Sequence, residues 1–317
     1  MRPEDVGIRT AAILQTIEQA VVGKHQVLEW VMAGVLSGGH LLFEDAPGLG
    51  KTLIARSFAQ VLGLDFKRIQ FTPDLLPGDV TGSDVFDRKE DRFRFIPGPI
   101  FTHVLLADEI NRATPKTQSA LLEAMQEFQV SIGGVTRPLG EPFVVVATQN
   151  PVEFEGTFPL PEAQIDRFIM RISVGYPELT DEVEIVRRRE QRNTDEIVLP
   201  AVSSREEILE MRAAVETVHI DPDLETYIVA LVRRTRSESS VQLGASPRGA
   251  LALLKLSRAV AAVRRRDYVL PDDIKEIAVA ALAHRLLLEP ELWAKAIRPQ
   301  DVVQSVLESV PVPKVSG

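Results

Sequence analysis

The sequence of 317 residues contains no cysteine, and this absence removes several classes of chemistry. Disulfide frameworks, cysteine–zinc centres and thiol catalysis are excluded. The chain also has no apolar run of the roughly 18 residues that a membrane helix requires. Its start, MRPEDVGIRTAAILQTIEQ, is polar and then becomes an amphipathic helix pattern, unlike a signal peptide. We therefore expect a cytoplasmic protein without a membrane span.

The sequence has fewer basic than acidic residues. Lysine and arginine number 36 against 45 aspartate and glutamate residues, so the net charge is −9. This balance argues against a protein built mainly to coat nucleic acid. The apolar fraction of 45% and the charged fraction of 26% are those of an ordinary globular protein. The length allows two domains or one large one.

The stretch LLFEDAPGLGKT, residues 41–52, ends like a loop that holds phosphates. It follows an apolar run at 41–43, which suits a buried strand, and precedes LIARSFAQVLG, which has apolar residues at helical spacing. In such a loop glycines let backbone N–H groups approach the phosphates, and the helix N-terminus adds partial positive charge. We expect Lys51 to reach the β- and γ-phosphates and Thr52 to ligate Mg²⁺.

One position departs from the strict pattern G-x-x-x-x-G-K-[ST], because Asp45 stands where a glycine is usual. Aspartate tolerates unusual backbone angles better than most residues. Pro47, Gly48 and Gly50 keep the tight part of the turn. The alternative is a surface turn before an ordinary helix.

Polar side chains also follow two further apolar runs. HVLLADEIN, residues 103–111, ends in Asp108 and Glu109, which could hold Mg²⁺ and orient or deprotonate a water. PFVVVATQNP has a strand at 143–146 and places Asn150 just beyond it, where it could contact the γ-phosphate or the water. The alternative for the acidic pair is a strand terminus that caps the next turn. With strand candidates at 66–71 and 167–174, the pattern predicts an open parallel sheet of five strands.

The run EDAPGLGKT … ADEINRA … TQNP … LPEAQIDRF … GASPR resembles the MoxR group of AAA+ ATPases over residues 4 to about 290. The resemblance implies an α/β fold, with a five-stranded parallel core sheet in the order 5-1-4-3-2 and a small all-helical lid. It implies ATP and Mg²⁺ as ligands. Lys51 and Thr52 match the Walker A motif, Asp108 and Glu109 the Walker B motif, and Asn150 sensor 1.

Two arginines and one further segment are assigned through the same resemblance. Arg167 matches the arginine finger, Arg248 matches sensor 2, and Val22-Gly23 resembles the segment that lines the adenine site. The residues expected to catalyse are Lys51, Glu109, Asn150 and Arg167, and those expected to hold the metal are Thr52 and Asp108. The residues expected to bind the nucleotide are Val22, Gly23, Pro47, Gly48, Leu49, Gly50, Lys51, Thr52, Leu53 and Arg248.

Each arginine has an alternative. Arg167 could pair with Asp166 or Glu162 in a weak surface ion pair, and Arg112 and Arg171 compete for its role. Ser246 suits a helix N-cap and Pro247 the first helical position. Arg248 would then lie in the first turn, where a cation opposes the helix dipole and a bound phosphate would offset that cost. The run 264–266 is expected to be a solvated helix end.

Two inserts and one boundary complete the prediction. The segments SDVFD and RFRFI can pair as a hairpin across 88–91, and Gly133-Gly134 predicts a second hairpin. They resemble the helix-2 insert and the pre-sensor 1 hairpin, which touch substrates in related ring ATPases; the alternative is that they only shape the subunit interface. We expect a core at 1–176, a lid at 177–310 and a tail at 311–317. Lid helices are predicted at 182–192, 204–218, 223–236, 246–263 and 272–287.

The resemblance favours an ATPase that hydrolyses ATP in a homo-oligomeric ring, expected to be a hexamer. Hydrolysis would drive remodelling, maturation or metal insertion in a client protein, with a von Willebrand factor A domain protein as partner. One alternative is a slow nucleotide switch or scaffold. Another is a nucleic-acid motor of the same clade, against which the acidic charge argues. The sequence does not name the client.

Overall fold

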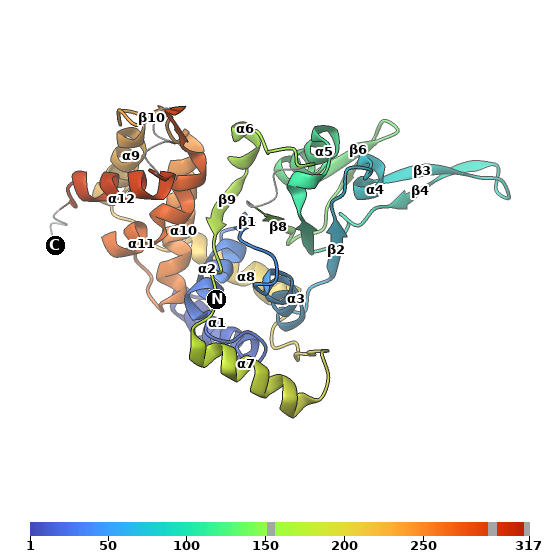
Figure 1. Cartoon of the computed structure of the whole chain (residues 1–317), viewed down its shortest axis with the longest axis horizontal. Coiled ribbons are helices and arrows are strands. Elements are labelled where there is room, and N and C mark those ends of the chain that lie inside the picture. The colour runs from blue at the N-terminus through green and yellow to red at the C-terminus, as the bar shows by residue number, and fades with distance from the viewer. Residues whose placement is uncertain (151–155, 291–296, 314–317) are drawn as a thin grey trace.

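The computed structural model describes residues 1–150, 156–290 and 297–313, and five parallel strands form its central sheet (Figure 1). These strands are β1 (His40–Glu44), β2 (Phe66–Gln70), β5 (Val104–Asp108), β8 (Val144–Gln149) and β9 (Phe168–Ile172). Their order is β2-β5-β8-β1-β9, which is 2-3-4-1-5 when the core strands alone are numbered along the chain. Read from the other edge, this is the predicted order 5-1-4-3-2, so the predicted fold class and sheet are confirmed.

Alternation along the strands produces two cores, one on each face of the sheet. Leu41 and Phe43 of β1 enter one hydrophobic cluster, whereas Leu42 between them enters the other. This is the two-residue period of a strand that is buried on both faces. The helices packed in the first cluster include α1 (Pro3–Ile17), α2 (His25–Leu36), α3 (Lys51–Val61) and α8 (Arg205–Glu216). The second cluster is covered by α4 (Pro77–Thr81), η1 (Ile110–Arg112) and α5 (Pro115–Glu127).

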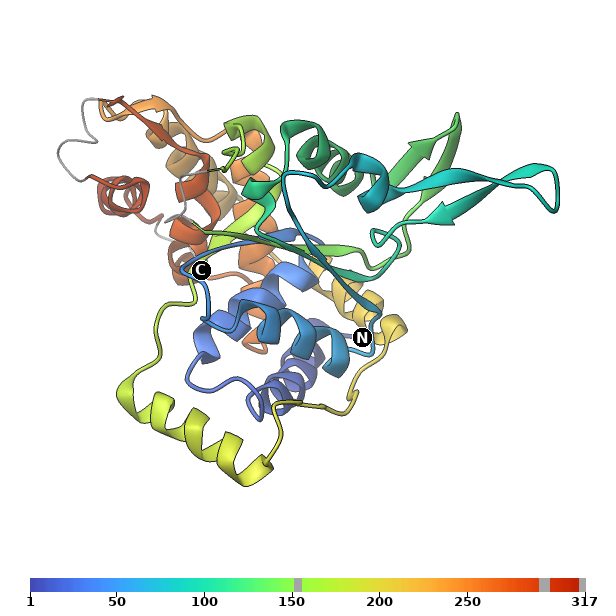
Figure 2. The ribbon, with the colours of Figure 1, turned by 45° about the vertical axis from the view of Figure 1, so that its right-hand side comes forward.

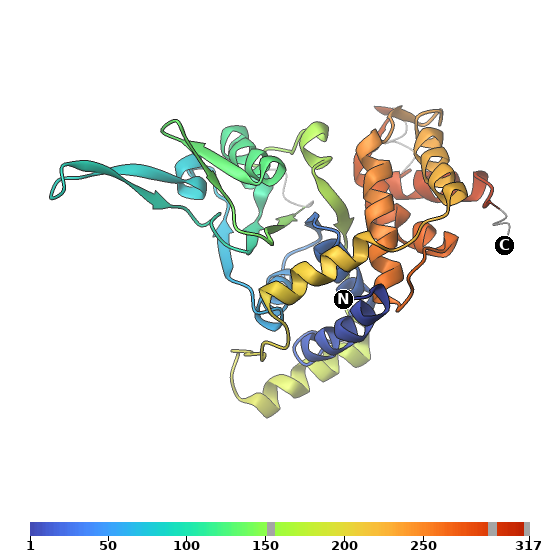
Figure 3. The same ribbon diagram turned by 180° about the vertical axis from the view of Figure 1, so that it is seen from behind.

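The C-terminal half is mostly helical. Its remaining elements are α6 (Glu162–Ile165), α7 (Leu179–Arg192), α9 (Pro222–Thr235), β10 (Val241–Leu243), α10 (Pro247–Val263), α11 (Pro271–Leu282), η2 (Ala283–Arg285), β11 (Leu287–Leu288) and α12 (Pro299–Ser309). Seen from behind, α8 lies beside α1 and α2 (Figure 3). One hydrophobic cluster therefore joins residues from both halves of the chain.

Four of the predicted helices in this half are confirmed within a few residues, but the one predicted at 272–287 is wrong at its end. Helix α11 stops at Leu282, and Leu287–Leu288 pairs with β10 as a short antiparallel strand. The buried side chain of Arg285 explains the break. It donates to the backbone oxygens of Asp166 and Phe168, each at 2.8 Å, at the start of β9. The sequence of the helix itself contains no sign of this distant requirement.

The expectation of a solvated arginine run at 264–266 is also wrong for two of its members. Arg266 donates to both carboxylate oxygens of Asp273, whose side chain is almost completely buried. Arg264 contacts Glu276 at 2.8 Å. These ion pairs connect the end of α10 to α11, so the run stabilises helix packing.

Both predicted hairpins are confirmed, and they project together from one side of the molecule (Figure 2). The first pairs β3 (Gly82–Asp87) with β4 (Arg92–Pro97), and the second pairs β6 (Gln129–Ile132) with β7 (Val135–Pro138). Arg137 links them, because its guanidinium lies 4.0 Å from the centre of the Phe95 ring and 3.6 Å from the Asp84 carboxylate.

Two peripheral features remain. Helix α7 lies along the edge of the molecule, and none of its side chains is buried (Figure 1). Part of the predicted tail, 314–317, lies outside the described residues. Among the helices of the described ranges, none combines the length and apolar character needed to cross a membrane.

Candidate nucleotide site

The loop between β1 and α3 has the backbone that a phosphate loop requires. Gly48 has φ +85° and Gly50 has φ +82°, and Gly50 is the N-cap residue of α3. Residues with a side chain rarely adopt these backbone angles, so the conformation of the loop favours glycine at both positions. A Cβ atom added at either position would meet nothing within 4 Å. The loop therefore stands open above the N-terminus of a helix, where backbone N–H groups can bind an anion.

Lys51 is nearly buried within this loop. Its Nζ donates to the carbonyl oxygens of Asp45, at 2.6 Å, and Ala46, at 3.1 Å. Burial lowers the pKa of its ammonium group, and the carboxylates of Asp45, Asp108 and Glu109 oppose that shift. A buried ammonium surrounded by loop carbonyls and facing open space fits an anionic ligand.

Asp45 has a structural role that the sequence does not reveal. Its backbone is not in the left-handed region, so the expected tolerance for unusual angles is not what the position uses. Instead its carboxylate accepts hydrogen bonds from the Ser173 hydroxyl, at 2.7 Å, and from the Val174 N–H. These bonds join the exit of β1 to the exit of β9. The departure from glycine thus strengthens the edge of the sheet that carries the loop.

The acidic pair lies at the end of β5, beside the loop. Asp108 and Glu109 line the same cavity of about 420 Å³ as Lys51, Thr52 and Asn150. Glu109 has φ +54° and ψ +51°, a left-handed backbone that is uncommon for a residue with a side chain. Such strain of about 1–3 kcal/mol persists where the surroundings impose it, often at functional sites. The strand-end arrangement predicted for these residues is therefore what the fold produces.

A second, more apolar cavity of about 360 Å³ adjoins the first, and Gly48, Leu49, Gly50 and Leu53 line both. Val22 lines this second cavity together with Ile54 and Ile197. The neighbouring Gly23 has φ +68°, and a Cβ there would overlap the Asp181 carboxylate of α7. Arginines of α7 close the far side: Arg188, Arg189 and Arg192. An apolar slot beside a phosphate loop suits the base of a nucleotide.

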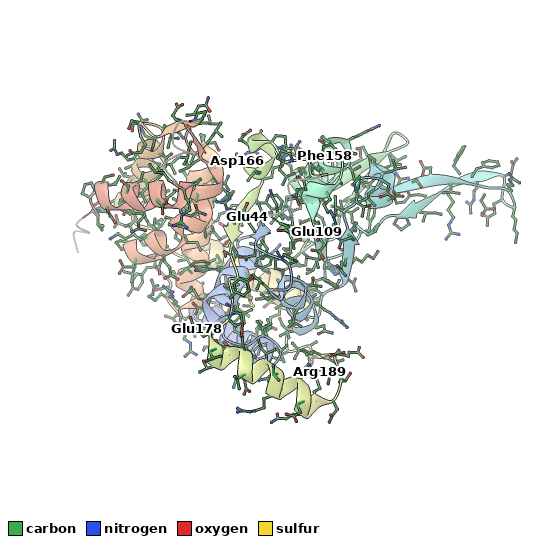
Figure 4. The ribbon with its side chains drawn as sticks, viewed as in Figure 1. Glu44, Glu109, Phe158, Asp166, Glu178 and Arg189 are labelled. Carbon is green, nitrogen blue, oxygen red and sulfur yellow. The ribbon has the colours of Figure 1, made fainter. Side chains whose placement is uncertain are left out.

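Arg167 and Arg248 lie at the opposite end of the sheet, where the parallel strands begin. Arg167 directly precedes β9, whereas the loop directly follows β1, and the two strands run parallel. A strand of five residues spans roughly 16 Å. Figure 4 shows Asp166 at one end of the sheet, with Glu44 and Glu109 toward the other. Neither arginine lines the cavities of the loop; both line a third cavity of about 330 Å³.

In the third cavity, one nitrogen of the Arg167 side chain lacks a hydrogen bond within the described part of the chain. Its Nε atom is buried without a hydrogen-bond partner among the described residues. Burial and the nearby charge of Arg248 lower the pKa of its guanidinium group. The alternative partner Asp166 instead bonds Arg285 and the Ser246 hydroxyl, with Arg248 at 4.0 Å.

The local geometry of Arg248 is as predicted, because Ser246 is the N-cap of α10 and accepts from the Arg248 N–H. Arg112 and Arg171, the alternative candidates for the arginine finger, have acidic partners at the end of the sheet that carries the phosphate loop. Arg112 contacts Glu109 at 3.0 Å, and Arg171 contacts Glu44 at 2.8 Å.

Comparisons with known proteins agree with this geometry. Residues 40–170 match the ATPase family associated with various cellular activities (AAA), and residues 233–306 match the AAA lid domain. The chain is 42% identical to Chaperone MoxR1 of Mycobacterium tuberculosis, over 97% of this chain and 85% of that protein. It is 33% identical to Protein MoxR of Methylorubrum extorquens, over 94% and 93% respectively. The chain belongs to the MoxR family of AAA+ ATPases.

Two further similar proteins match nearly the whole chain. The chain is 45% identical to the uncharacterized protein YeaC of Bacillus subtilis, over 98% of this chain and 97% of that one. A crystal structure from Cytophaga hutchinsonii, provisionally designated an ATPase, is 40% identical and superposes with a TM-score of 0.91. The superposition covers 98% of this chain and 97% of that one.

The site of this MoxR-family chain includes partners that the motifs do not contain. Arg68 of β2 donates to the Asp108 carboxylate at 2.7 Å, and Gln70 donates to the Glu109 carboxylate at 2.7 Å. Gln70 stands opposite Asp108 in the β2–β5 register. Only the strand pairing brings them there. The one signal in the sequence is that three of the five residues of β2, FKRIQ, are polar.

MoxR-family membership implies use of a nucleotide and Mg²⁺, and the donor set fits a magnesium ion. Mg²⁺ prefers oxygen ligands and is usually held by one or two carboxylates together with substrate phosphates. The Asp108 carboxylate and the Thr52 hydroxyl line one cavity beside the phosphate loop. The described residues contain no separate cluster of histidine and carboxylate ligands that could hold another metal.

Proposed function

We propose that the protein hydrolyses Mg²⁺-bound ATP in a ring of identical subunits and uses the cycle to remodel a client protein. The observation that carries the proposal is that the charged groups are divided between the two ends of the parallel strands. The loop lysine and the acidic pair line one cavity, while Arg167 and Arg248 line another at the far edge.

Each residue near the loop has a proposed task that its position supports. Lys51 and the glycine backbone hold the phosphates, and Thr52 and Asp108 hold Mg²⁺. Magnesium, when bound, neutralises charge on the phosphates. Glu109 orients the attacking water and accepts its proton, and Asn150 at the end of β8 contacts the γ-phosphate or that water. Val22 and Leu53 cover the base, with Gly23 beside them.

The two distant arginines are proposed to serve a neighbouring subunit. A separation of roughly one strand length keeps Arg167 from the nucleotide of its own chain. Its partly exposed side chain, whose Nε atom has no hydrogen-bond partner among the described residues, supports a role toward an anion supplied from outside. Because Arg248, the predicted sensor 2 residue, lines the same cavity, we propose that the nucleotide it contacts is also the neighbour's.

We propose a hexamer in which residues 1–176 form the nucleotide-binding core and 177–310 the lid. The relative named Chaperone MoxR1 supports a chaperone-type activity. A von Willebrand factor A domain protein is the proposed partner, and maturation or metal insertion the proposed outcome for the client; both rest on the resemblance to MoxR proteins. The alternatives are a slow nucleotide switch and a nucleic-acid motor.

Two substitutions test the ATPase proposal. Lys51→Ala should abolish tight ATP binding, because it removes the cation from the phosphate loop. Glu109→Gln should keep ATP binding but lower turnover by about 10² or more, because it removes the proton acceptor. Calorimetry measures binding and phosphate release measures turnover. The exposed residues Lys116 and Glu210 provide matched controls, Lys116→Ala and Glu210→Gln, which should behave as wild type.

Unchanged binding in Lys51→Ala would reject the phosphate loop, and wild-type turnover in Glu109→Gln would reject the role of Glu109. Glu109→Gln should also hold ATP-bound assemblies together. Co-purification of a von Willebrand factor A domain protein with this variant, and not with Lys51→Ala, is the result expected of a remodeller. Co-purification independent of nucleotide favours a scaffold.

A further inference from the structure

Thr148 connects the acidic pair to the neighbouring strand through one hydroxyl group. Its Oγ1 donates to Oδ1 of Asp108 at 2.6 Å and accepts from the Glu109 N–H at 2.8 Å. The side chain is almost completely buried, and it lines the cavity of the phosphate loop. A single hydroxyl therefore contacts both residues proposed to hold the metal and orient the water.

The backbone explains why such a contact is needed. The paired register of β5 and β8 ends at Ala107 and Ala147, and the chain then turns into the left-handed region at Glu109. Beyond the ladder, the N–H of Glu109 has no strand partner there, and the Thr148 hydroxyl accepts it. A buried N–H without an acceptor would cost about 1–3 kcal/mol.

The same hydroxyl fixes the orientation of the Asp108 carboxylate. Thr148 bonds Oδ1, and Arg68 bonds Oδ2 from the other side. Arg68 is half exposed on an edge strand, whereas Thr148 is enclosed at the end of a central strand. The threonine is thus the constrained member of the two contacts.

We propose that Thr148 is the positioning residue for magnesium in this site. Its hydroxyl holds the Asp108 carboxylate in the orientation that binds the metal and holds the strained Glu109 backbone in the same arrangement. Removal of the hydroxyl should weaken the metal contribution to ATP binding while the phosphate loop stays intact. This inference rests on the proposed function.

The test compares Thr148→Val, which removes the hydroxyl, with Thr148→Ser, which keeps it. Thr148→Ala serves as a second hydroxyl-free variant if valine does not fold. The probe is ATP, whose affinity is measured by calorimetry in EDTA and across a magnesium titration. Outer-shell partners of a metal site typically contribute 10–100-fold to metal affinity. Thr148→Val should therefore shift the magnesium midpoint upward by about tenfold or more, with ATP affinity in EDTA unchanged and Thr148→Ser close to wild type.

Thr235 provides a matched control. Its buried hydroxyl also makes two bonds, donating to the Val232 carbonyl at 2.7 Å and accepting from the Ala245 N–H at 3.1 Å. It lies on α9 and lines neither cavity of the loop. Thr235→Val should lower stability without moving the magnesium midpoint. Hydrogen exchange of a peptide spanning 108–112, measured without nucleotide, should quicken in Thr148→Val and not in Thr235→Val.

The outcomes separate this inference from the proposed function. If the magnesium midpoint of Thr148→Val equals that of wild type, or shifts no more than that of Thr235→Val, Thr148 is only structural and the inference is overturned. The same holds if Thr148→Ser fails to restore the midpoint. If wild-type ATP affinity itself is independent of magnesium, the proposed metal site fails and this inference fails with it.

Discussion

A single buried imidazole illustrates how the fold fixes a protonation state. His40 at the start of β1 accepts the Val145 N–H at Nδ1, 3.0 Å away, and Nε2 lies 2.9 Å from the Met125 carbonyl oxygen. With a donor facing Nδ1, that nitrogen must carry no proton, so the ring is neutral with its hydrogen on Nε2. Burial accordingly lowers the pKa of His40 to about 4.

This predicts a loss of stability in mild acid. Because the folded pKa lies below the unfolded value of about 6.5, the unfolded chain binds more protons in between. The contribution of His40 is complete above about pH 6.5 and is lost as the pH falls toward about 4. Between about pH 7.5 and about pH 5, it should remove about 2 kcal/mol from the free energy of unfolding.

Urea unfolding at both pH values measures the effect. His284 is also buried with a lowered pKa, so wild type alone would mix the two contributions. The variant His40→Gln can still accept and donate one hydrogen bond each but does not titrate. Its stability should vary with pH by about 2 kcal/mol less than that of wild type. Equal pH dependence would show that His40 is not the responsible group.

Residues within short motifs could be predicted from the sequence, because the local chain already determines their surroundings. Asp108 is the last residue of one strand and Lys51 follows another strand across a short loop, and parallel strands end at the same end of a sheet. Arg68, Thr148 and Arg285 could not be predicted. The partners that matter in the site and at the start of β9 lie 39 residues or more away along the chain, and only the pairing of strands or the packing of the lid brings them together.

At the level of elements, the two hairpins are connected through the turn of the second. Gly133 has φ +58° and Gly134 has φ +78°, so both positions favour glycine. They differ in their surroundings. A Cβ at Gly133 would overlap the Asp84 carboxylate, whereas one at Gly134 would meet nothing within 4 Å. Asp84 is also the partner of Arg137, so the first position alone affects the contact between the hairpins.

This contrast gives a paired prediction. Gly133→Ala and Gly134→Ala should each lower the free energy of unfolding by about 1–2 kcal/mol, because a side chain strains the left-handed backbone. Urea unfolding measures this change. Only Gly133→Ala should displace Asp84 from Arg137. Hydrogen exchange of residues 82–97 should then quicken in Gly133→Ala and stay near wild type in Gly134→Ala. Equal exchange in the two variants would mean that the hairpins are not coupled through this contact.

The core strands and the second hairpin could be predicted because short apolar runs and paired glycines are local signals. The end of α11 could not, since its apolar residues continue past Leu282 at a spacing that a helix would also use. What stops the helix is the requirement of Arg285 to reach the start of β9. Element boundaries fail where a distant hydrogen bond competes with local propensity.

For the whole molecule, the parallel sheet separates the two parts of the proposed catalytic site. Every core strand points its carboxyl end toward the phosphate loop, so a residue that precedes β9 must lie at the opposite end of the strands. In the proposed assembly, a surface that offers arginines meets a different surface that offers a nucleotide cavity; this contact is heterologous, and repeating it closes a ring when the rotation between subunits closes. The polarity of the strands supports the proposed assembly.

This arrangement predicts complementation between two inactive variants. A trans arginine can raise turnover by about 10³ to 10⁵, which corresponds to roughly 4 to 7 kcal/mol of barrier. Arg167→Ala should lose hydrolysis and keep ATP binding, and Lys51→Ala should lose binding. When they are mixed, the Arg167→Ala chain supplies an intact cavity and the Lys51→Ala chain supplies the arginine, so phosphate release should recover in part.

The control uses Arg167→Ala mixed with a Lys51→Ala/Arg167→Ala double variant, which supplies no arginine and should recover nothing. Native mass spectrometry establishes that both mixtures contain mixed oligomers. Wild-type activity should also rise more steeply than linearly with protein concentration, because each site needs two subunits. A lack of recovery in proven mixed oligomers, together with linear wild-type activity, would contradict the shared site. It would favour a monomeric nucleotide switch, in which the cavity at the far edge of the sheet has no part in hydrolysis.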